Sequence, residues 1–330
     1  MNRPTITVLG ATGAQGGGVV QALLADPGRS HAVRAVTRRP QGAAAARLRA
    51  AGCEVVQADL DDRASLCRAF AGTHGVFAVT NFWEHMSPER ELRQVENIAA
   101  AAASAEVAHL VWSTLEDVRK YVALTDPRLP TLRSRWKVPH FDAKGEGNRR
   151  FLEHGVPTTF LHTSFFWENF IHFGLGPRRS TSGDLVLALP MGERPLPGIA
   201  AGDIGAVAVA LFACPGEALG RSIGIAGEHL TGAQMAAALG RAIGEPIRYA
   251  PPTWSEFAAQ DLPGADDLAN MFAFKHDFNK AFCALRDVEV TRRLHPALSS
   301  FDAWLERHAA RIPIPPPVQP LPPLRADLRA

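Results

Sequence analysis

Three glycines stand at equal spacing near the start of the chain, at positions 10, 13 and 16. They follow the apolar run Ile6-Thr7-Val8-Leu9 and precede a helix-like segment from Val19 to Leu24. Such a strand–turn–helix unit permits a tight turn, close approach of the backbone to a pyrophosphate, and close helix–strand packing. The helix N-terminus adds free N–H groups and a partial positive charge. The alternative is a glycine-rich turn without a ligand, but the flanking elements favour a dinucleotide site. Its expected pyrophosphate loop is Gly10, Ala11, Thr12, Gly13, Ala14, Gln15 and Gly16.

The end of the second expected strand, from Ala32 to Val36, indicates which dinucleotide binds. An NAD site usually carries an acidic residue there, which holds the ribose hydroxyls. Here Arg38 and Arg39 follow the strand instead. A guanidinium can form charge-assisted bonds to a 2′-phosphate and stack on adenine. The sequence therefore favours NADP(H), although NAD(H) remains possible. The alternative interpretation of the two arginines is a solvated basic turn before Pro40.

Two further short segments follow expected strands at points where open α/β sheets bind ligands. Asp59 and Leu60 come after the third strand, where such folds contact the adenine edge. Thr80, Asn81 and Phe82 come after the fourth, where the chain passes the ribose and nicotinamide. We expect all five residues to line the cofactor.

The residues for proton transfer depart from the usual pattern. Ordinary short-chain dehydrogenases use Tyr-x-x-x-Lys, in which the tyrosine protonates the carbonyl. This chain has two tyrosines, Tyr121 and Tyr249, and neither has a lysine four residues later. Lys144 is the candidate lysine, and His140 stands four residues before it, one helical turn away. We expect Lys144 to hold the ribose; a general acid–base role for Lys144, with His140 as a proton relay, and a plain surface lysine are the alternatives.

Other residue patterns allow weaker interpretations. Ser113-Thr114 follows the fifth expected strand, either as the serine of a reductase or as a helix cap. The aromatic residues around the fourth and sixth strands form either an apolar wall for a flat substrate or core packing; they are Phe82, Trp83, Phe165, Phe166 and Trp167. The twelve histidines show no metal spacing, so we expect no metal site.

The elements that must position these residues alternate along the first part of the chain. Six β-like runs between Ile6 and Leu161 are separated by helix-like segments, which predicts a doubly wound parallel sheet of the Rossmann type. Later segments suggest a smaller, mostly helical C-terminal region, with Asp203 capping one helix and Thr231 another that ends at Gly244. We expect a dinucleotide-binding domain over 1–164, a smaller substrate- or partner-binding region over 165–311 whose elements can interleave with the first, and a proline-rich tail over 312–330.

The composition narrows the class of protein. The chain has 330 residues, of which 46% are hydrophobic, so a sizeable core can form. A net charge of +2 without basic clusters gives no reason to expect a nucleic-acid partner. No apolar run is long enough to span a membrane. The four cysteines form no CxxC pair, which fits a reducing cytoplasm better than a disulfide framework.

Several stretches, taken in order, resemble the NmrA-like family of atypical short-chain dehydrogenases/reductases, and most closely its NADP(H)-sensing redox-sensor branch. The likeness runs from about residue 5 to about residue 308. It rests on the segments 8–17, 36–40, 80–84, 140–146, 167–169 and 264–272.

The resemblance implies a fold that prefers NADP(H) and a cofactor lined by residues matching Thr12, Gln15, Arg38, Asn81 and Lys144. It adds Phe166 and Asn169 to the expected lining, and Arg93 in place of a frequent lysine. Two features depart from the family. The proline tail is one, and His162-Thr163-Ser164-Phe165-Phe166, where a proline is common, is the other. The second departure leaves the nicotinamide contacts of that segment open.

Two functions follow from these observations. The missing tyrosine and the resemblance favour a redox sensor or regulator that responds to the NADPH/NADP+ ratio. The alternative is an NADPH-dependent reductase of a quinone or flat carbonyl, supported by Lys144 and the aromatic residues. Besides the dinucleotide, the partners expected are a protein or a small flat substrate, and a homodimer is compatible with either function.

Overall fold

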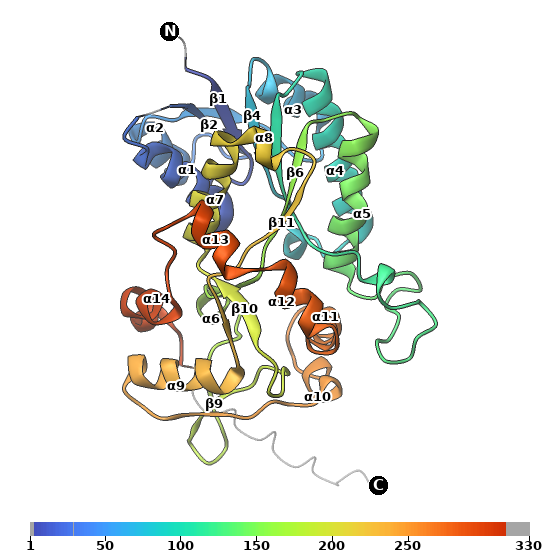
Figure 1. The fold of residues 1–330 in the computed structure, drawn as a ribbon, viewed down its shortest axis with the longest axis vertical. Coiled ribbons are helices and arrows are strands. Elements are labelled where there is room, and N and C mark those ends of the chain that lie inside the picture. Colours follow the sequence, from blue (N-terminus) through green and yellow to red (C-terminus); the bar gives the residue numbers. More distant parts are fainter. Residues whose placement is uncertain (1–2, 29, 315–330) are drawn as a thin grey trace, which may run out of the picture.

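A seven-stranded parallel sheet forms the upper half of the molecule (Figure 1). The computed structural model describes residues 3–28 and 30–314. The strand order is β11-β6-β5-β4-β1-β2-β3, and every neighbouring pair is parallel. The strands are β1 (Thr5–Val8), β2 (Ala32–Thr37), β3 (Glu54–Gln57), β4 (Gly75–Ala78), β5 (His109–Thr114), β6 (Thr158–His162) and β11 (Ser222–Gly224).

The order of these strands creates the place where a ligand can bind. The chain runs outward from β1 through β2 to β3, and then returns across β1 to β4. At such a switch point the two connections leave on opposite faces of the sheet, so a crevice opens at the carboxyl ends of the strands. The crevice lies between the segments that follow β1 and β4.

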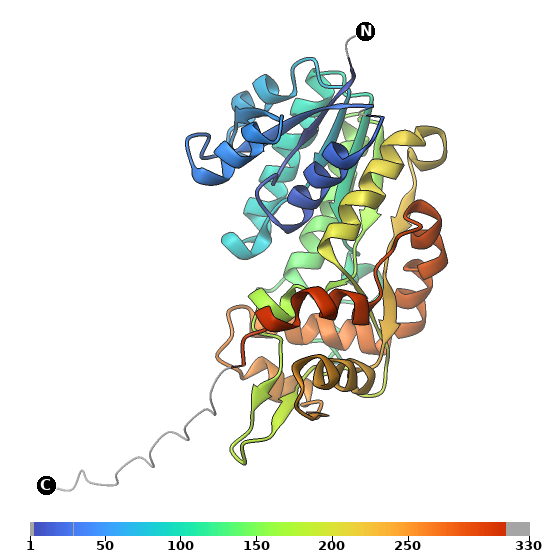
Figure 2. The same ribbon diagram turned by 90° about the vertical axis from the view of Figure 1, so that its left-hand side faces the viewer.

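Helices cover both faces of the sheet (Figure 2). One face packs against α1 (Ala14–Ala25), α2 (Ala43–Ala50) and α7 (Ala201–Ala213). The other packs against α3 (Arg63–Phe70), α4 (Pro88–Ser104) and α5 (Pro139–Glu153). Because both faces are covered, every residue of the inner strands β4, β5 and β6 is buried, polar residues included. These observations confirm the Rossmann-type fold expected from the sequence.

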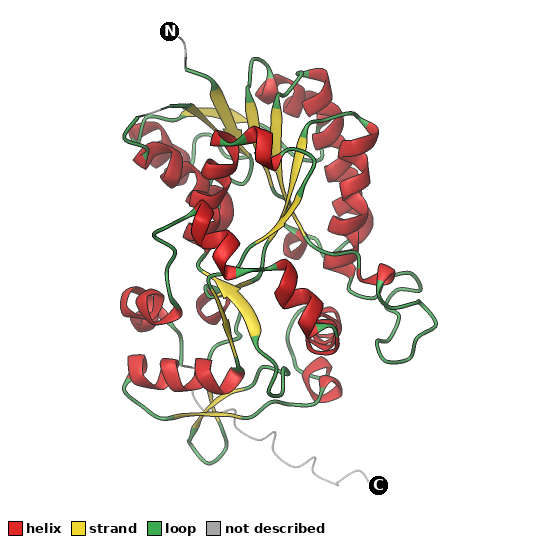
Figure 3. Cartoon of the chain, in the orientation of Figure 1, coloured by secondary structure: helices red, strands yellow, loops and turns green. Residues whose placement is uncertain are grey.

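The lower half of the molecule is smaller and mostly helical (Figure 3). It holds two three-stranded sheets, ordered β12-β10-β7 and β13-β9-β8. Their strands are β7 (Phe165–Phe166), β8 (Arg178–Arg179), β9 (Leu185–Leu187), β10 (Leu196–Ile199), β12 (Glu228–Leu230) and β13 (Ile247–Tyr249). The remaining helices are α6 (Asn169–His172), α8 (Pro215–Ala218), α9 (Gly232–Ile243), α10 (Trp254–Ala258), α11 (Ala265–Asp277), α12 (Asn279–Leu285), α13 (Val288–Leu294) and α14 (Phe301–His308). The 3-10 turns are η1 (Phe82–Glu84), η2 (Val118–Lys120) and η3 (Ala309–Arg311).

Of the expected helix caps, Thr231 and Gly244 agree with the structure and Asp203 does not. Thr231 caps α9 through a reciprocal capping box with Gln234, and Gly244 ends the helix with a φ of 82°. Asp203 is not a cap, because α7 already begins at Ala201; its carboxylate instead accepts the backbone N–H of Ser299 at 3.0 Å. Helix α5 begins at Pro139, since proline suits the first helical position, and it contains His140 and Lys144 one turn apart as their spacing predicts. The proline-rich tail from residue 315 lies outside the described residues.

Helices α1 and α7 touch backbone to backbone, although 180 or so residues separate them in the sequence. A β-carbon built on Gly205 of α7 would lie 2.1 Å from the carbonyl carbon of Gly18 on α1. No side chain fits at that distance, so the two glycines set the spacing of the helices. The glycine loop 10–13 leads into the start of α1, so α7 also supports the helix that follows this loop. The division of the chain after residue 164 stays a prediction.

We expect Gly205→Ala to push α7 away from α1 and to lower the free energy of unfolding by about 1–3 kcal/mol. Gly202→Ala is the matched control on the same helix, because a β-carbon there meets nothing within 4 Å. The control should leave stability unchanged or raise it by up to about 1 kcal/mol, since alanine favours helix. Chemical denaturation of both variants measures the difference, and equal midpoints would contradict the packing described here.

Candidate dinucleotide-binding site

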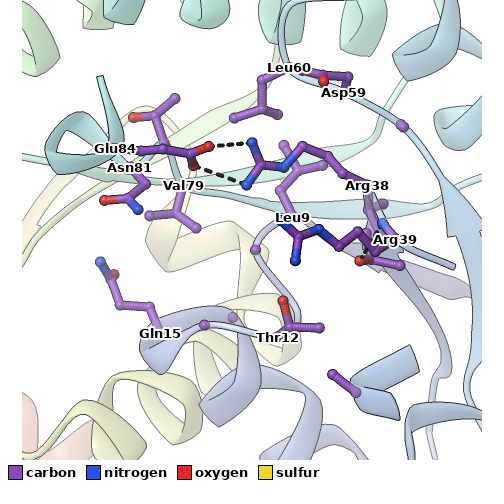
Figure 4. A pocket seen from close by; sticks show the side chains of 18 of the residues that line it. Leu9, Thr12, Gln15, Arg38, Arg39, Asp59, Leu60, Val79, Asn81 and Glu84 are labelled. Atoms are coloured by element: carbon purple, nitrogen blue, oxygen red, sulfur yellow. Dashed lines mark hydrogen bonds and ion pairs between the residues drawn. The ribbon is translucent and has the colours of Figure 1, made fainter. Parts of the chain in front are cut away.

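A groove of about 730 Å³ runs along the carboxyl ends of the central strands (Figure 4). Its walls come from the glycine loop, the segments after β2, β3 and β4, and the start of the second region. The lining residues that the sequence singled out are Gly10, Thr12, Gly13, Ala14, Gln15, Gly16, Arg38, Arg39, Asp59, Leu60, Thr80, Asn81 and Phe166. The sequence patterns therefore located one continuous groove from segments spread over more than 150 residues.

The glycine loop has the geometry that a pyrophosphate requires. Gly10 has a φ of 63°, and its carbonyl accepts the N–H of Gly13 at 2.8 Å, which closes the turn. A β-carbon on Gly16 would lie 2.3 Å from the Gly10 carbonyl oxygen. No side chain of the described residues caps the N-terminus of α1. Its first N–H groups therefore remain available to an anion.

Ser113 serves this loop from the end of β5. Its hydroxyl donates a hydrogen bond of 2.7 Å to the Gln15 side-chain carbonyl. Thr114 donates to Asn148 on α5, also at 2.7 Å. Because both residues lie inside the strand, the helix-cap interpretation of this pair is wrong. Ser113 instead fixes the orientation of the Gln15 side chain at the edge of the groove.

Arg38 forms an ion pair inside the groove that the sequence did not indicate. Its guanidinium donates two hydrogen bonds to Glu84, one of them 3.1 Å long, from Nη2 to Oε2. Glu84 also lines the groove, at the end of η1. Arg39 forms no ion pair with a carboxylate of residues 3–28 or 30–314, so its guanidinium is open to an anionic ligand.

Lys144 lies at the centre of a buried polar network beside the groove. Its ammonium is 2.8 Å from Glu91 Oε1 and donates to the Thr80 hydroxyl at 2.5 Å and to the Thr80 carbonyl at 3.2 Å. The Thr80 hydroxyl also hydrogen-bonds Glu91. Glu91 is fully buried on α4. The interpretation of Lys144 as a surface lysine is therefore wrong; Lys144 lies behind Thr80, which does line the groove.

The charge on Glu91 is set by this network. Burial by itself raises the pKa of a carboxyl, but the Lys144 charge and hydrogen bonds from His85, Lys144 and Thr80 outweigh it. Together they hold the pKa of Glu91 to about 2. Glu91 is thus a carboxylate at neutral pH. Glu91 could not be found from the sequence, because nothing in an isolated helix sequence shows which glutamate turns inward to meet a lysine on another helix.

His140 has a partner of its own in the second region. Its Nδ1 is 2.6 Å from Asp267 Oδ1, and its backbone N–H donates to Asp267 Oδ2 at 3.2 Å. The Trp83 and Phe141 rings pack against the imidazole at centroid distances of 4.8 Å each. His140 does not line the groove. It ties the start of α5 to α11, and in the described part of the chain its side chain forms no hydrogen bond or ion pair with Lys144.

Five residues expected at the cofactor lie outside the groove: Ala11, Phe82, Arg93, Lys144 and Asn169. Ala11 and Phe82 are buried beneath it. Arg93 lines a separate shallow depression with Asp61, Arg90, Glu96 and Asn97. The helix turns explain this: Glu91, Gln94 and Val95 form the buried face of α4, and Arg93 falls between them on the exposed side. Trp167 and Phe165, which could have formed a substrate wall, are buried in the core of the second region.

Two classes of site are missing from the part of the chain that the structure describes. No three histidine, cysteine, aspartate or glutamate side chains in it are grouped so that they could hold a metal ion. None of its helices is long and apolar enough to cross a membrane.

The strand order, the glycine loop before α1 and the groove at the switch point define a Rossmann-type NAD(P)-binding fold. Comparison with known families then gives the particular one. The NmrA-like family model matches residues 2–305, nearly the whole chain, and the protein belongs to that family. The resemblance found in the sequence is thereby confirmed.

Individual relatives and structures agree with this assignment. The chain is 35% identical over 245 residues to the (4-alkanoyl-5-oxo-2,5-dihydrofuran-3-yl)methyl phosphate reductase of Streptomyces griseus subsp. griseus, covering 74% of this chain and 76% of that protein. Its fold is similar to that of NmrA, a negative transcriptional regulator, in complex with NADP; the TM-score is 0.74 at 20% identity, over 94% of this chain and 96% of the other. It is also similar to the NADPH-dependent quinone oxidoreductase QOR2 of Escherichia coli, with a TM-score of 0.71 at 22% identity over 92% and 99% of the two chains.

We expect Gly16→Ala to abolish dinucleotide binding, because the new methyl group collides with the Gly10 carbonyl and forces the loop open. Gly17→Ala is the control, since a β-carbon there meets its nearest neighbour, the Ala11 carbonyl, at an ordinary 3.6 Å. Calorimetric titration with NADPH compares the two variants, and thermal unfolding checks that each is folded. Wild-type affinity in folded Gly16→Ala would show that the ligand does not use this loop.

We expect Glu91→Gln to lower the free energy of unfolding at pH 7 on the order of 3–5 kcal/mol, because it leaves the Lys144 ammonium buried without a counter-charge. The pKa of Glu91 falls from 4.5 to about 2 in the folded protein, so its stabilisation is complete above pH 4.5 and is lost as the pH falls toward 2. The difference between the variant and the wild type should narrow over that range. Glu89→Gln, an exposed site on the same helix, is the control, and a pH-independent difference would contradict the assignment.

Proposed function

We propose that the protein is an NADP(H)-dependent reductase of a quinone or another flat, conjugated carbonyl compound. The observation that carries the proposal is the buried ammonium of Lys144, held by Glu91 and Thr80 where the fourth strand meets the groove. A positive charge fixed at this point can stabilise an oxyanion that forms during hydride transfer, in addition to holding the cofactor.

The two arginines after β2 support NADP(H) over NAD(H). Arg38 and Arg39 line the end of the groove where the acidic residue of an NAD site would stand. Arg39 has no carboxylate partner among the described residues, and a guanidinium is well suited to a phosphate. The start of α1 has no side-chain cap, and Gly16 leaves no side chain between the helix and the loop. Both features suit a pyrophosphate that lies between the two arginines and Lys144.

The chain's own residues have distinct tasks in this proposal. The bound nicotinamide supplies a hydride. Thr80 and Glu91 hold the Lys144 side chain in place, and Ser113 holds Gln15 at the edge of the groove. Lys144 can then hold a ribose hydroxyl or stabilise an oxyanion by its charge. Since the chain lacks the usual tyrosine, an acceptor whose reduced oxyanion is weakly basic needs the least help with protonation, which favours quinones.

The names of relatives support a reductase. The Streptomyces relative is named as a reductase of a dihydrofuranone phosphate, and the structural neighbour QOR2 as a quinone oxidoreductase. Both substrates are conjugated carbonyl compounds.

A sensor without turnover is the second candidate, and one feature of η1 favours it. Glu84 at its end faces the groove, while the neighbouring Trp83 packs on Phe173 of the second region at 4.9 Å between ring centroids. The indole also lies over Gly264, where a β-carbon would be 2.8 Å away. A change at the groove could therefore reach the second region through two adjacent residues.

We expect stopped-flow absorbance to show that NADPH is oxidised by quinones and scarcely by simple ketones or aldehydes, with NADH consumed more slowly. Lys144→Met should reduce the quinone rate by roughly 100-fold or more, because the positive charge beside the groove is lost. Lys120→Met is the control, because Lys120 is an exposed lysine on η2, and it should leave the quinone rate unchanged.

Three outcomes separate the candidates. Quinone turnover that depends on Lys144 supports the reductase. Tight NADPH binding without oxidation by any acceptor supports the sensor. Fast reduction of a plain ketone by folded Lys144→Met would show that the chemistry takes place elsewhere.

A further inference from the structure

The Arg38–Glu84 ion pair stands where the sequence places a phosphate. Arg38 follows β2, and Glu84 ends the turn that follows β4. In the sheet, β1 lies between β4 and β2, so the pair bridges the groove above the carboxyl end of β1, where the glycine loop begins (Figure 4). Both side chains line the groove. The Glu84 carboxylate thus accepts the hydrogen bonds that Arg38 is expected to donate to the 2′-phosphate of the cofactor.

The Glu84 carboxylate can be replaced on Arg38 by another anion at little cost. Its side chains are 53% and 42% exposed, and an ion pair in contact with water contributes little net stability. The Arg38 guanidinium lowers the pKa of Glu84, so the competitor is charged at neutral pH. A 2′-phosphate offers Arg38 more negative charge than a carboxylate does, and the same two-pronged hydrogen bonding. The interaction of Arg38 with such a phosphate is therefore strong enough to displace Glu84.

Glu84 has the opposite relation to an unphosphorylated ribose. A carboxylate at this end of a Rossmann groove accepts hydrogen bonds from the ribose hydroxyls of NAD(H). Next to a 2′-phosphate, the same carboxylate loses its partner and faces a like charge. Glu84 comes from the turn after β4 rather than from the end of β2, so a search for the usual acidic residue does not find it.

We propose that Glu84 determines cofactor selectivity: it competes with the 2′-phosphate for Arg38 and so narrows the preference for NADP(H) over NAD(H) that the two arginines create. This inference rests on the proposed function, since it takes the groove to be the dinucleotide site. Arg39, which has no carboxylate partner among the described residues, supplies charge for the phosphate whether or not Glu84 is displaced. Glu84 therefore tunes the selectivity and does not abolish NADP(H) binding.

The test is the affinity of Glu84→Gln for NADP+ and NAD+, measured by calorimetry. The amide keeps the size of the side chain but removes the charge. We expect the dissociation constant for NADP+ to fall roughly 3- to 10-fold, while that for NAD+ stays constant or rises. Glu54→Gln is the matched control: it removes the same charge from a pair with Arg34, 2.8 Å long, that does not line the groove.

Fragments of the cofactor locate the effect. Adenosine 2′,5′-bisphosphate should gain affinity in Glu84→Gln as NADP+ does, and adenosine 5′-monophosphate should not. Equal changes for phosphorylated and unphosphorylated ligands, or no change for either, would overturn the inference. If the folded wild type bound neither dinucleotide, the proposed function would fail together with the inference. Binding of NADP+ with unchanged selectivity in the variant would overturn the inference alone.

Discussion

The buried contact between the Lys144 ammonium and the Glu91 carboxylate joins the parts of the molecule that meet at the groove. Glu91 belongs to α4, Lys144 to α5, and the Thr80 that both contact follows β4. Since each charge would be costly to bury alone, the three elements keep their relative positions as long as the pair is intact. The ion pair therefore fixes the wall of the groove that follows β4. It also fixes the distance from Lys144 to the glycine loop, which follows the neighbouring strand β1.

The sequence predicted those parts of the site that depend on neighbouring residues. A strand, three spaced glycines and a helix are local features, and the arginines after β2 follow directly from the chain order. Glu84 and Glu91 could not be found in this way, because each acquires its role from a partner at least 46 residues away. Arg93 was misplaced because it was matched by its charge alone, whereas the turn of α4 carries Glu91 inward and leaves Arg93 outside.

The second region was the least predictable, since long-range polar pairs organise it. Arg286 on the segment after α12 is fully buried and bonded to Glu116, 170 residues earlier, and to the carbonyl of Thr163. Lys275 on α11 is enclosed by three phenylalanine rings, and burial, with the nearby Arg286 charge, lowers its pKa to about 7. Nothing in the local sequence of α11 shows that its lysine turns inward among aromatic rings.

The packing of α7 against α1 has a consequence for the order in which the protein can take shape during its synthesis. The ribosome completes α1 early, yet the surface that covers it is translated only at residues 201–213. Until then Val19, Val20 and Leu23, which are buried in the finished protein, lack one of their neighbours. The glycine loop at the head of α1 is held from behind by the same late helix. A nascent chain therefore exposes an apolar helix for most of its elongation, and its glycine loop is fully supported only after about two thirds of the protein has been made.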